Sequence, residues 1–372
     1  MGNLRKKASD TAVKAVANAV EFIRKIKPND KVVVVNDDDC DGVCSGTIMN
    51  MVLKSFCKNK PVQVSTEWNM TLSKKLVKKI LSFKPRYVII SDVPDINRKF
   101  LERISKKARI LVIDHHSVSK YKNVVYSNPR LIDADAYLPA TYLMYKISEK
   151  LRVKNKKITW IAAVGVLGDH GVESCEDLFA NLKKDFPDLI GDSELTSENL
   201  RQNSKLGLLA KIVDAGRVVK ADAGAAHVAK VLLQVKDYEY LLKGKTAAAK
   251  KLVGWYDVVE KEFEELVGEF KEKSVPVGKT LFFEFKSRLN IKSSLASAVG
   301  GVYDDKVVVI AQHEGKYYTL SMRRGKNATT DLDRLMRTAI KGIPDSFGGG
   351  HPQASGGRIP AKYMGAFKKN LA

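Results

Sequence analysis

Aspartates crowd the end of one apolar run in this chain. Residues 32–35 are all valine, and four carboxylates follow within five positions: Asp37, Asp38, Asp39 and Asp41. At about 4 Å, a like-charge pair costs roughly 1 kcal/mol in water and about 4 kcal/mol near a protein surface. A fold keeps such a cluster only if positive charge sits in it. A hard divalent cation is the natural occupant.

Two further apolar runs end in the same way. Residues 87–90 lead to Asp92, and residues 110–113 lead to Asp114, His115 and His116. Short β-branched runs between helical patterns predict a parallel sheet with crossover helices. Ligands of open α/β sheets bind beyond the carboxyl ends of the strands. We therefore expect one site to gather Asp37, Asp39, Asp41, Asp92, His115 and His116, joined by Asp169 at a glycine-flanked turn after the apolar stretch 157–168.

These motifs resemble those of the DHH phosphoesterase superfamily. Residues 37–42 resemble its first motif in the DxDxDG form of RecJ-type exonucleases, Asp92 the second motif, residues 114–116 the third and Asp169 the fourth. Residues 348–356, Gly-Gly-Gly-His-Pro-Gln-Ala-Ser-Gly, resemble the GGGHxxAxG signature of the DHH-associated C-terminal domain. The motifs occur in family order over nearly the whole chain, which makes the resemblance specific.

The resemblance implies a two-metal centre. One ion would take Asp37, Asp39 and Asp92, and the other Asp41, Asp92, His115 and Asp169. Mixed imidazole and carboxylate ligands favour Mn²⁺, with Mg²⁺ or Co²⁺ as substitutes. Asp114 would orient the histidines and His116 would contact the scissile phosphate. Alternation along an extended strand turns Asp38 away, so we expect it to be a cap or loop hydrogen-bonder, and Asn36 or Ser45 to cap the following helix.

A second set of residues is expected to bind substrate. Ser321 and Arg323 resemble the family's Ser-x-Arg element. The glycines Gly348, Gly349 and Gly350 would let backbone N–H groups approach an anion, as phosphate-binding loops do. We expect Arg323 and His351 to hold a phosphate or a terminal nucleotide.

The predicted organisation is α/β with two domains. A parallel-sheet DHH domain covers residues 1–245, with a helical insert at about 172–245. A connecting helix covers 246–274, although a capping helix of the first domain is the alternative. A smaller α+β substrate-binding domain covers 275–372, with a cleft between the two domains. A domain of roughly 100 residues is of ordinary size.

Composition indicates the class of partner. The chain has 372 residues and a formal net charge of +22, which favours polyanions such as single-stranded nucleic acid; solvated lysine-rich helix faces are the alternative. We find neither an apolar run of about 20 residues nor a signal peptide, so we expect no membrane association. The four cysteines form no CxxC pair, which is typical of a reducing cytoplasm.

We therefore expect a metal-dependent, single-strand-specific exonuclease that releases mononucleotides from DNA or RNA. The alternative is a nanoRNase, nucleotide phosphatase or cyclic-dinucleotide phosphodiesterase; such relatives usually carry a histidine at the position of Val35. A third hypothesis is a non-catalytic replication or repair factor. A nuclease could also bind a replication or repair protein, and the helical insert would then be the docking surface. Trp68, Tyr137, Tyr317 and Tyr318 could stack on bases, but core packing is commoner, so none is predicted as a site.

Overall fold

The computed structural model describes residues 2–66, 72–94, 96–117 and 119–372, with side chains from residue 8 onward, so Trp68 lies outside the described part of the chain. The chain divides into two compact units, Met1–Tyr256 and Asp257–Ala372. No helix among the described residues combines the length and the apolar character that crossing a bilayer requires.

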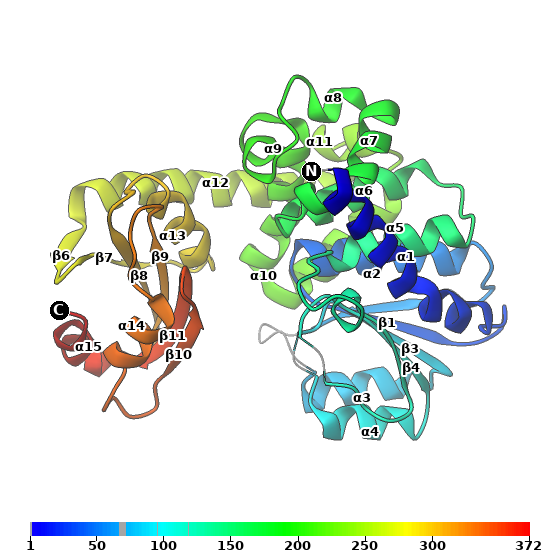
Figure 1. Ribbon diagram of the computed structural model, residues 1–372, viewed down its shortest axis with the longest axis horizontal. Coiled ribbons are helices and arrows are strands. Elements are labelled where there is room, and N and C mark those ends of the chain that lie inside the picture. Colours follow the sequence, from blue (N-terminus) through cyan, green and yellow to red (C-terminus); the bar gives the residue numbers. More distant parts are fainter. Residues whose placement is uncertain (1, 67–71, 95, 118) are drawn as a thin grey trace. The chain divides into compact units, whose positions relative to one another are not determined.

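The first unit is built on a five-stranded parallel sheet (Figure 1). Its strands are β1 (Val32–Asn36), β2 (Val62–Ser65), β3 (Tyr87–Ser91), β4 (Arg109–Ile113) and β5 (Val124–Ser127), in the spatial order β2-β1-β3-β4-β5. The predicted α/β class and parallel sheet are confirmed. The order reverses next to β1, because β2 pairs on one side of it and β3 on the other.

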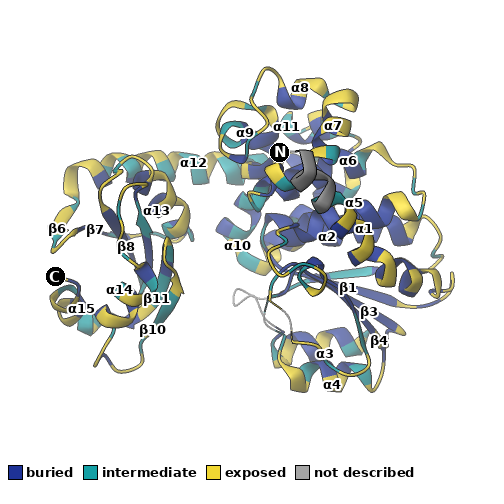
Figure 2. Ribbon diagram, in the orientation of Figure 1, coloured by how far each residue is buried: buried dark blue, intermediate teal, exposed yellow. Residues whose placement is uncertain are grey.

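Helices cover both faces of this sheet, and alternate residues of each strand serve different cores (Figures 1 and 2). Val32 and Val34 face a large core that also contains residues of α1 (Gly2–Arg24), α2 (Cys40–Lys54), α5 (Ala140–Lys150) and α6 (Lys156–Gly168). Val33 and Val35 face a smaller core with α3 (Lys74–Ser82) and α4 (Arg98–Ser105). Burial on both faces explains why the strands are continuous apolar runs.

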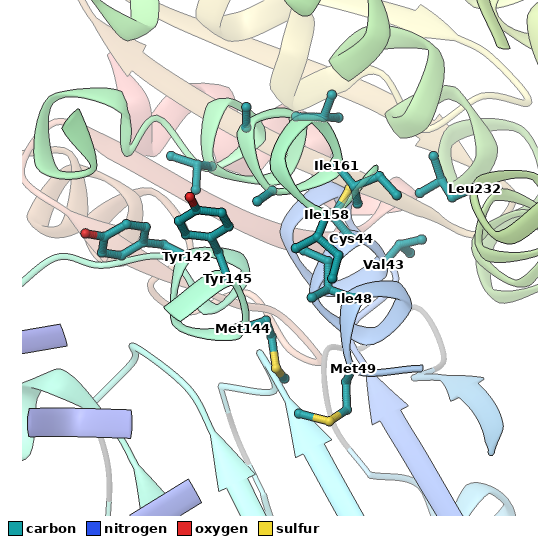
Figure 3. Packing of buried hydrophobic residues seen from close by; sticks show 14 of the residues in the cluster. Val43, Cys44, Ile48, Met49, Tyr142, Met144, Tyr145, Ile158, Ile161 and Leu232 are labelled. Carbon is teal, nitrogen blue, oxygen red and sulfur yellow. The ribbon is translucent and has the colours of Figure 1, made fainter. Parts of the chain in front are cut away.

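The large core anchors the helix that follows the first acidic motif. Figure 3 shows Cys44 and Ile48 of α2 among Ile158 and Ile161 of α6 and Leu232 of α10 (Lys205–Gln234). All five side chains are essentially inaccessible to solvent. Each fully buried aliphatic side chain contributes roughly 1.5–3 kcal/mol, so α2 is held rigidly beneath the acids that precede it.

The rest of the first unit is helical, with α7 (Glu176–Asp185), α8 (Pro187–Ile190), α9 (Ser197–Asn203), α10 and α11 (Tyr238–Leu242). Helix α10 is two helices that meet at Ala221, whose φ of 48° and ψ of −131° are not helical. Gly216 and Gly224 pass so closely that a Cβ on Gly224 would lie 1.8 Å from the carbonyl oxygen of Gly216. The sharp reversal therefore requires glycine there.

The second unit is a six-stranded mixed sheet in the order β10-β11-β9-β8-β7-β6. Its strands are β6 (Val275–Val277), β7 (Thr280–Lys286), β8 (Val307–Glu314), β9 (Tyr317–Arg324), β10 (Phe347–His351) and β11 (Ala354–Pro360). Helix α12 (Ala247–Lys273) begins in the first unit and ends in the second, where Phe270 packs on Phe283. Helices α14 (Leu332–Ala339) and α15 (Met364–Leu371) pack on one sheet face; α13 (Lys292–Gly300) contacts β8 and β9.

Candidate metal centre

The candidate site lies at the carboxyl ends of neighbouring parallel strands. Asp37 follows β1, Asp92 follows β3 and Asp114 follows β4, and these three strands are adjacent in the sheet. Parallel strands present their carboxyl ends at one edge, and ligand sites of such sheets lie where the strand order reverses. The position is therefore the one that the fold class favours.

Two groups of side chains offer ligand atoms that all lie within 4.8 Å of one another. One group is Asp92, Asp114, His115 and His116, and the other is Asp41, His115 and Asp169. His115 belongs to both, so the groups form one continuous cluster. Four separate segments of the chain supply it, and the structure thus brings together most of the residues expected from the sequence.

Asp92 is the most constrained member of this cluster. Its backbone has a φ of 57°, which non-glycine residues rarely adopt. The side chain is 3% exposed, and Oδ1 accepts no hydrogen bond from the described residues, although it lies 3.3 Å from His115 Nε2. Burial, and then the charges of Asp41 and Asp39, raise the pKa of this carboxyl well above its usual range. A strained backbone that aims an unpartnered carboxylate at other acids suits a cation ligand.

His115 is held as a neutral imidazole. Burial, followed by the charge of His116, lowers the pKa of His115 to about 4. Arg130 Nε donates to the His115 carbonyl over 2.8 Å, which fixes the backbone. The ring atom Nδ1 is buried without a hydrogen-bond partner among the described residues. The other ring nitrogen, Nε2, lies 3.3 Å from Asp92 Oδ1 and 3.5 Å from Asp169 Oδ2. A neutral imidazole that turns a nitrogen toward carboxylates is the form in which histidine binds metals.

His116 differs from its neighbour in the exposure of its side chain, in the hydrogen bonding of its ring and in the direction of its pKa shift. Its side chain is 39% exposed, and its Nδ1 lies 2.8 Å from Asp114 Oδ1. Burial alone would lower the pKa of His116, but the hydrogen bond and charge of Asp114 outweigh it and raise that pKa. Asn128 Nδ2 donates to the His116 carbonyl. Asp114 therefore fixes the orientation of the His116 ring.

Backbone and phenol groups position the remaining two acids. Asp41 accepts from the N–H groups of Ala140 (2.8 Å) and Thr141 (2.9 Å), so it caps the N-terminus of α5. Tyr137 donates its hydroxyl to Asp169 Oδ2 over 2.8 Å, and its ring meets the His115 ring edge-on at 5.3 Å. Burial raises the pKa of Asp169 to about 6, against the opposing hydrogen bond of Tyr137. The sequence did not identify Tyr137 as part of the site.

Asp37 and Asp39 are not in either group of the described residues. Asp37 Oδ1 accepts from the Thr66 hydroxyl at 2.5 Å, and burial together with the charge of Asp39 raises the pKa of Asp37 to about 7. Asp39 Oδ1 accepts from the Gly42 N–H at 2.9 Å and caps α2, which begins at Cys40. The expectation that Asn36 or Ser45 caps this helix is wrong, because the helix starts two residues before Gly42.

Asp39 still acts on the cluster through its charge, since it raises the pKa of Asp41 and Asp92 as well as that of Asp37. Its carboxylate has one oxygen engaged in capping, and a carboxylate oxygen has lone pairs to spare. Asp37 and Asp39 are thus coupled to the cluster through the charge of Asp39, which raises the pKa of its members. The two-metal ligand set proposed for them remains a prediction.

Asp38 has a partner that the sequence could not reveal. Burial raises the pKa of Asp38 to about 6, and the charge of Arg217 opposes that shift. Arg217 comes from α10, where its Nε lies 2.6 Å from Asp214 Oδ1. The expectation that Asp38 is a cap or loop hydrogen-bonder stays a prediction, and the charge of Arg217 in the helical insert acts on Asp38. No local pattern signals this contact, because it joins positions far apart in the chain.

The second unit places the expected substrate-binding residues on two strands, β9 and β10, that lie on either side of β11. Arg323 and His351 both lie opposite Ala354, and Ser321 and Gly349 both lie opposite Gly356, so β9 and β10 flank β11. Arg323 Nη1 lies 3.3 Å from Ser321 Oγ, and Nε donates to Ser297 Oγ over 3.1 Å. These serines hold the guanidinium in a fixed orientation.

The glycine triplet is not the loop that was expected. Gly348, Gly349 and Gly350 lie within strand β10 and pair with β11. The N–H of Gly350 donates to Asp333 Oδ1 of α14 over 2.8 Å, so one of the three expected anion donors already has a partner. The triplet forms a strand because β11 offers a complete antiparallel ladder beside it.

Comparison with known proteins identifies the family to which both units are similar. Residues 31–168 match the family model of the DHH family, N-terminal domain, and residues 281–372 match that of the DHHA1 domain. A search of the curated proteins finds no match. Among solved structures, RecJ from Thermus thermophilus in complex with Mn²⁺ has a TM-score of 0.70 at 16% identity, covering 97% of this chain and 54% of RecJ. The chain thus spans about half the length of that protein.

Two further structures match over nearly their full length. Exonuclease RecJ bound to manganese has a TM-score of 0.68 at 15% identity, covering 97% of this chain and 93% of that one. The DHH domain of a protein assigned to a family of ribosomal proteins has a TM-score of 0.70 at 16% identity, covering 100% of this chain and 95% of that one. The domain matches, the shared fold and the ordered motifs together establish that the chain belongs to the DHH phosphoesterase superfamily, with a RecJ-like fold.

Proposed function

We propose that this protein is a metal-dependent phosphodiesterase that removes mononucleotides from an end of single-stranded DNA or RNA. One observation carries the proposal: Asp92 Oδ1 is buried without a hydrogen-bond partner among the described residues, and it lies 3.3 Å from His115 Nε2 within a cluster of carboxylates and imidazoles. Unsatisfied buried polar atoms are costly unless a ligand satisfies them. Divalent cations are the ligands that this donor set fits.

The residues that would hold two ions are those implied by the family motifs. Asp37, Asp39 and Asp92 would hold one, and Asp41, Asp92, His115 and Asp169 the other. When bound, the pair would polarise the phosphate and lower the pKa of an attacking water. Manganese is the proposed ion, because the set mixes nitrogen and oxygen donors and two structures of similar fold carry manganese.

Other side chains of the protein would orient the metal ligands and bind the substrate. Asp114 orients His116 so that Nε2 would contact the scissile phosphate, and the raised pKa of His116 favours its cationic form beside an anion. Tyr137 fixes the carboxylate of Asp169. In the second unit, Arg323, with its head group positioned by serines, would bind a phosphate of the substrate together with His351.

Several features favour a long single strand over a small substrate. The net charge of +22 suits a polyanion, and valine stands at position 35, where small-substrate relatives usually carry histidine. The similarity to an exonuclease over almost its full length supports the same choice. The helical insert α7–α11 remains the candidate surface for a replication or repair protein.

The test is a panel of end-labelled substrates with manganese: long single-stranded DNA, long single-stranded RNA, dinucleotides and cyclic dinucleotides. Stepwise shortening from one labelled end supports the proposal, and cleavage of dinucleotides alone supports the small-substrate alternative. Asp92→Ala and His115→Ala should abolish turnover. Binding without turnover, unchanged in Asp92→Ala, would indicate a non-catalytic factor and overturn the proposal.

A further inference from the structure

One face of the sheet in the second unit is partly open. Leu320, Met322 and Ile359 of β9 and β11 belong to the core that α14 and α15 cover. Side chains alternate across a strand, so Tyr317 and Arg358 point to the opposite face. Ser321 and Arg323, the expected substrate-binding residues, lie on that same opposite face, since they stand an even number of positions from Tyr317.

This opposite face carries an exposed aromatic–arginine cluster, formed by Tyr317, Phe347 and Arg358. The guanidinium carbon of Arg358 lies 4.5 Å from the ring centre of Tyr317 and 4.9 Å from that of Phe347. Phe347 is 58% exposed, although it is among the most apolar residues of the second unit. An exposed phenylalanine stacked on an arginine can bind both an aromatic ring, by stacking, and a negatively charged group, through the guanidinium.

The strip between this cluster and Arg323 is lined by small residues. A Cβ on Gly356 would meet a single atom, the carbonyl oxygen of Leu320 at 3.4 Å. A Cβ on the next residue, Gly357, would lie 2.9 Å from the sulfur of Met336 on the covered face. Space is therefore left at Gly356 of β11, whereas its neighbour on β9, Ser321, is 2% exposed. Arg323 stands six positions after Tyr317 along β9, a distance of about 20 Å.

We propose that single-stranded nucleic acid lies along this strip, with a phosphate at Arg323 and a base stacked on the aromatic–arginine cluster. This inference rests on the proposed function. Stacked nucleotides advance roughly 3.4 Å each, so the strip spans about six of them, and fewer if the strand is extended. A protein partner could also bind to an exposed aromatic side chain. A strip of small residues between two arginines, however, fits a narrow ligand with evenly spaced negative charges better than it fits a protein surface.

The test measures binding, not turnover. Fluorescence anisotropy with labelled DNA and RNA strands of increasing length, in chelator, would be compared for wild type, Phe347→Ala and Phe347→Tyr in the full chain. Loss of one stacked base should weaken binding of strands of about six nucleotides or more by roughly 5- to 100-fold. Dinucleotides should bind equally to all three proteins, and Phe347→Tyr, which keeps the π-face, should bind like wild type.

A matched control removes a cation–aromatic contact elsewhere in this unit. Lys362 stacks on Tyr363, which packs against the covered core, so Lys362→Ala should not change the dependence of affinity on length. Equal affinity of wild type and Phe347→Ala for every length would overturn the inference while the exonuclease proposal stands. Absence of single-strand binding in all variants would overturn both. A change in self-association without a change in strand binding would identify the face as a protein interface and also overturn the inference.

Discussion

Asp92→Asn should stabilise the metal-free protein while removing its metal affinity. Asp92 is buried, and the charges of Asp41, Asp39, Asp114 and Asp169 all raise its pKa. Asparagine has nearly the same shape and, like aspartate, tolerates the left-handed backbone that position 92 requires. The substitution therefore removes charge repulsion with little change in packing or backbone strain.

The magnitude follows from the geometry of the cluster. Ligand atoms of Asp92 and Asp114 lie within 4.8 Å, where two like charges cost about 0.9 kcal/mol in water and about 3.5 kcal/mol at an effective dielectric constant of 20. We expect a gain of about 1–3 kcal/mol in the free energy of unfolding at pH 8. For a unit of this size, that corresponds to an increase of roughly 2–10 °C in Tm.

The gain should depend on pH with a definite sign. The folded-state pKa of Asp92 is raised above the ordinary value of 3.8, so the folded protein binds more protons than the unfolded chain. The contribution of Asp92 to the free energy of unfolding of the wild type must then fall as pH rises above about 4. The Asp92→Asn variant lacks this contribution. The difference between the two proteins should be small near pH 4 and largest at pH 8.

The assay is thermal unfolding in chelator at several pH values, repeated with manganese. Metal should stabilise the wild type by mass action and leave the Asp92→Asn variant unchanged. Asp257→Asn, on the exposed surface of α12, controls for the loss of one negative charge. A variant that is no more stable than wild type in chelator at pH 8 would show that the carboxylates do not repel one another, and the reasoning for a cation site would fail.

Three further substitutions test individual contacts. Arg217→Gln leaves the buried Asp38 without its cation and should lower the free energy of unfolding by about 1–3 kcal/mol at pH 8, measured with urea; equal stability would refute the contact. Tyr137→Phe keeps the ring but frees the carboxylate of Asp169, so calorimetry should find manganese affinity about tenfold lower, and unchanged affinity would count against this role. Arg323→Ala should raise KM for a labelled single strand about tenfold with a smaller effect on kcat, and an unchanged KM would contradict its role in binding.

Local sequence signals were sufficient to predict the architecture of the first unit. Continuous β-branched runs at residues 32–35, 87–90 and 110–113 predict strands buried on both faces, and the polar residues that follow them predict a site at one edge of the sheet. Both predictions depend only on periodicity and on the order of residues within a few positions. The sheet and most of the residues of the cluster can therefore be predicted from the sequence alone.

Tertiary structure alone decided how individual side chains are used. Asp39 caps α2, the charge of Arg217 acts on Asp38 from a helix nearly 180 positions away, and the glycine triplet forms a strand because β11 lies beside it. The cluster of Tyr317, Phe347 and Arg358 likewise exists only because three strands pair in one register. Contacts between distant positions depend on how the whole chain packs, and no local pattern encodes them.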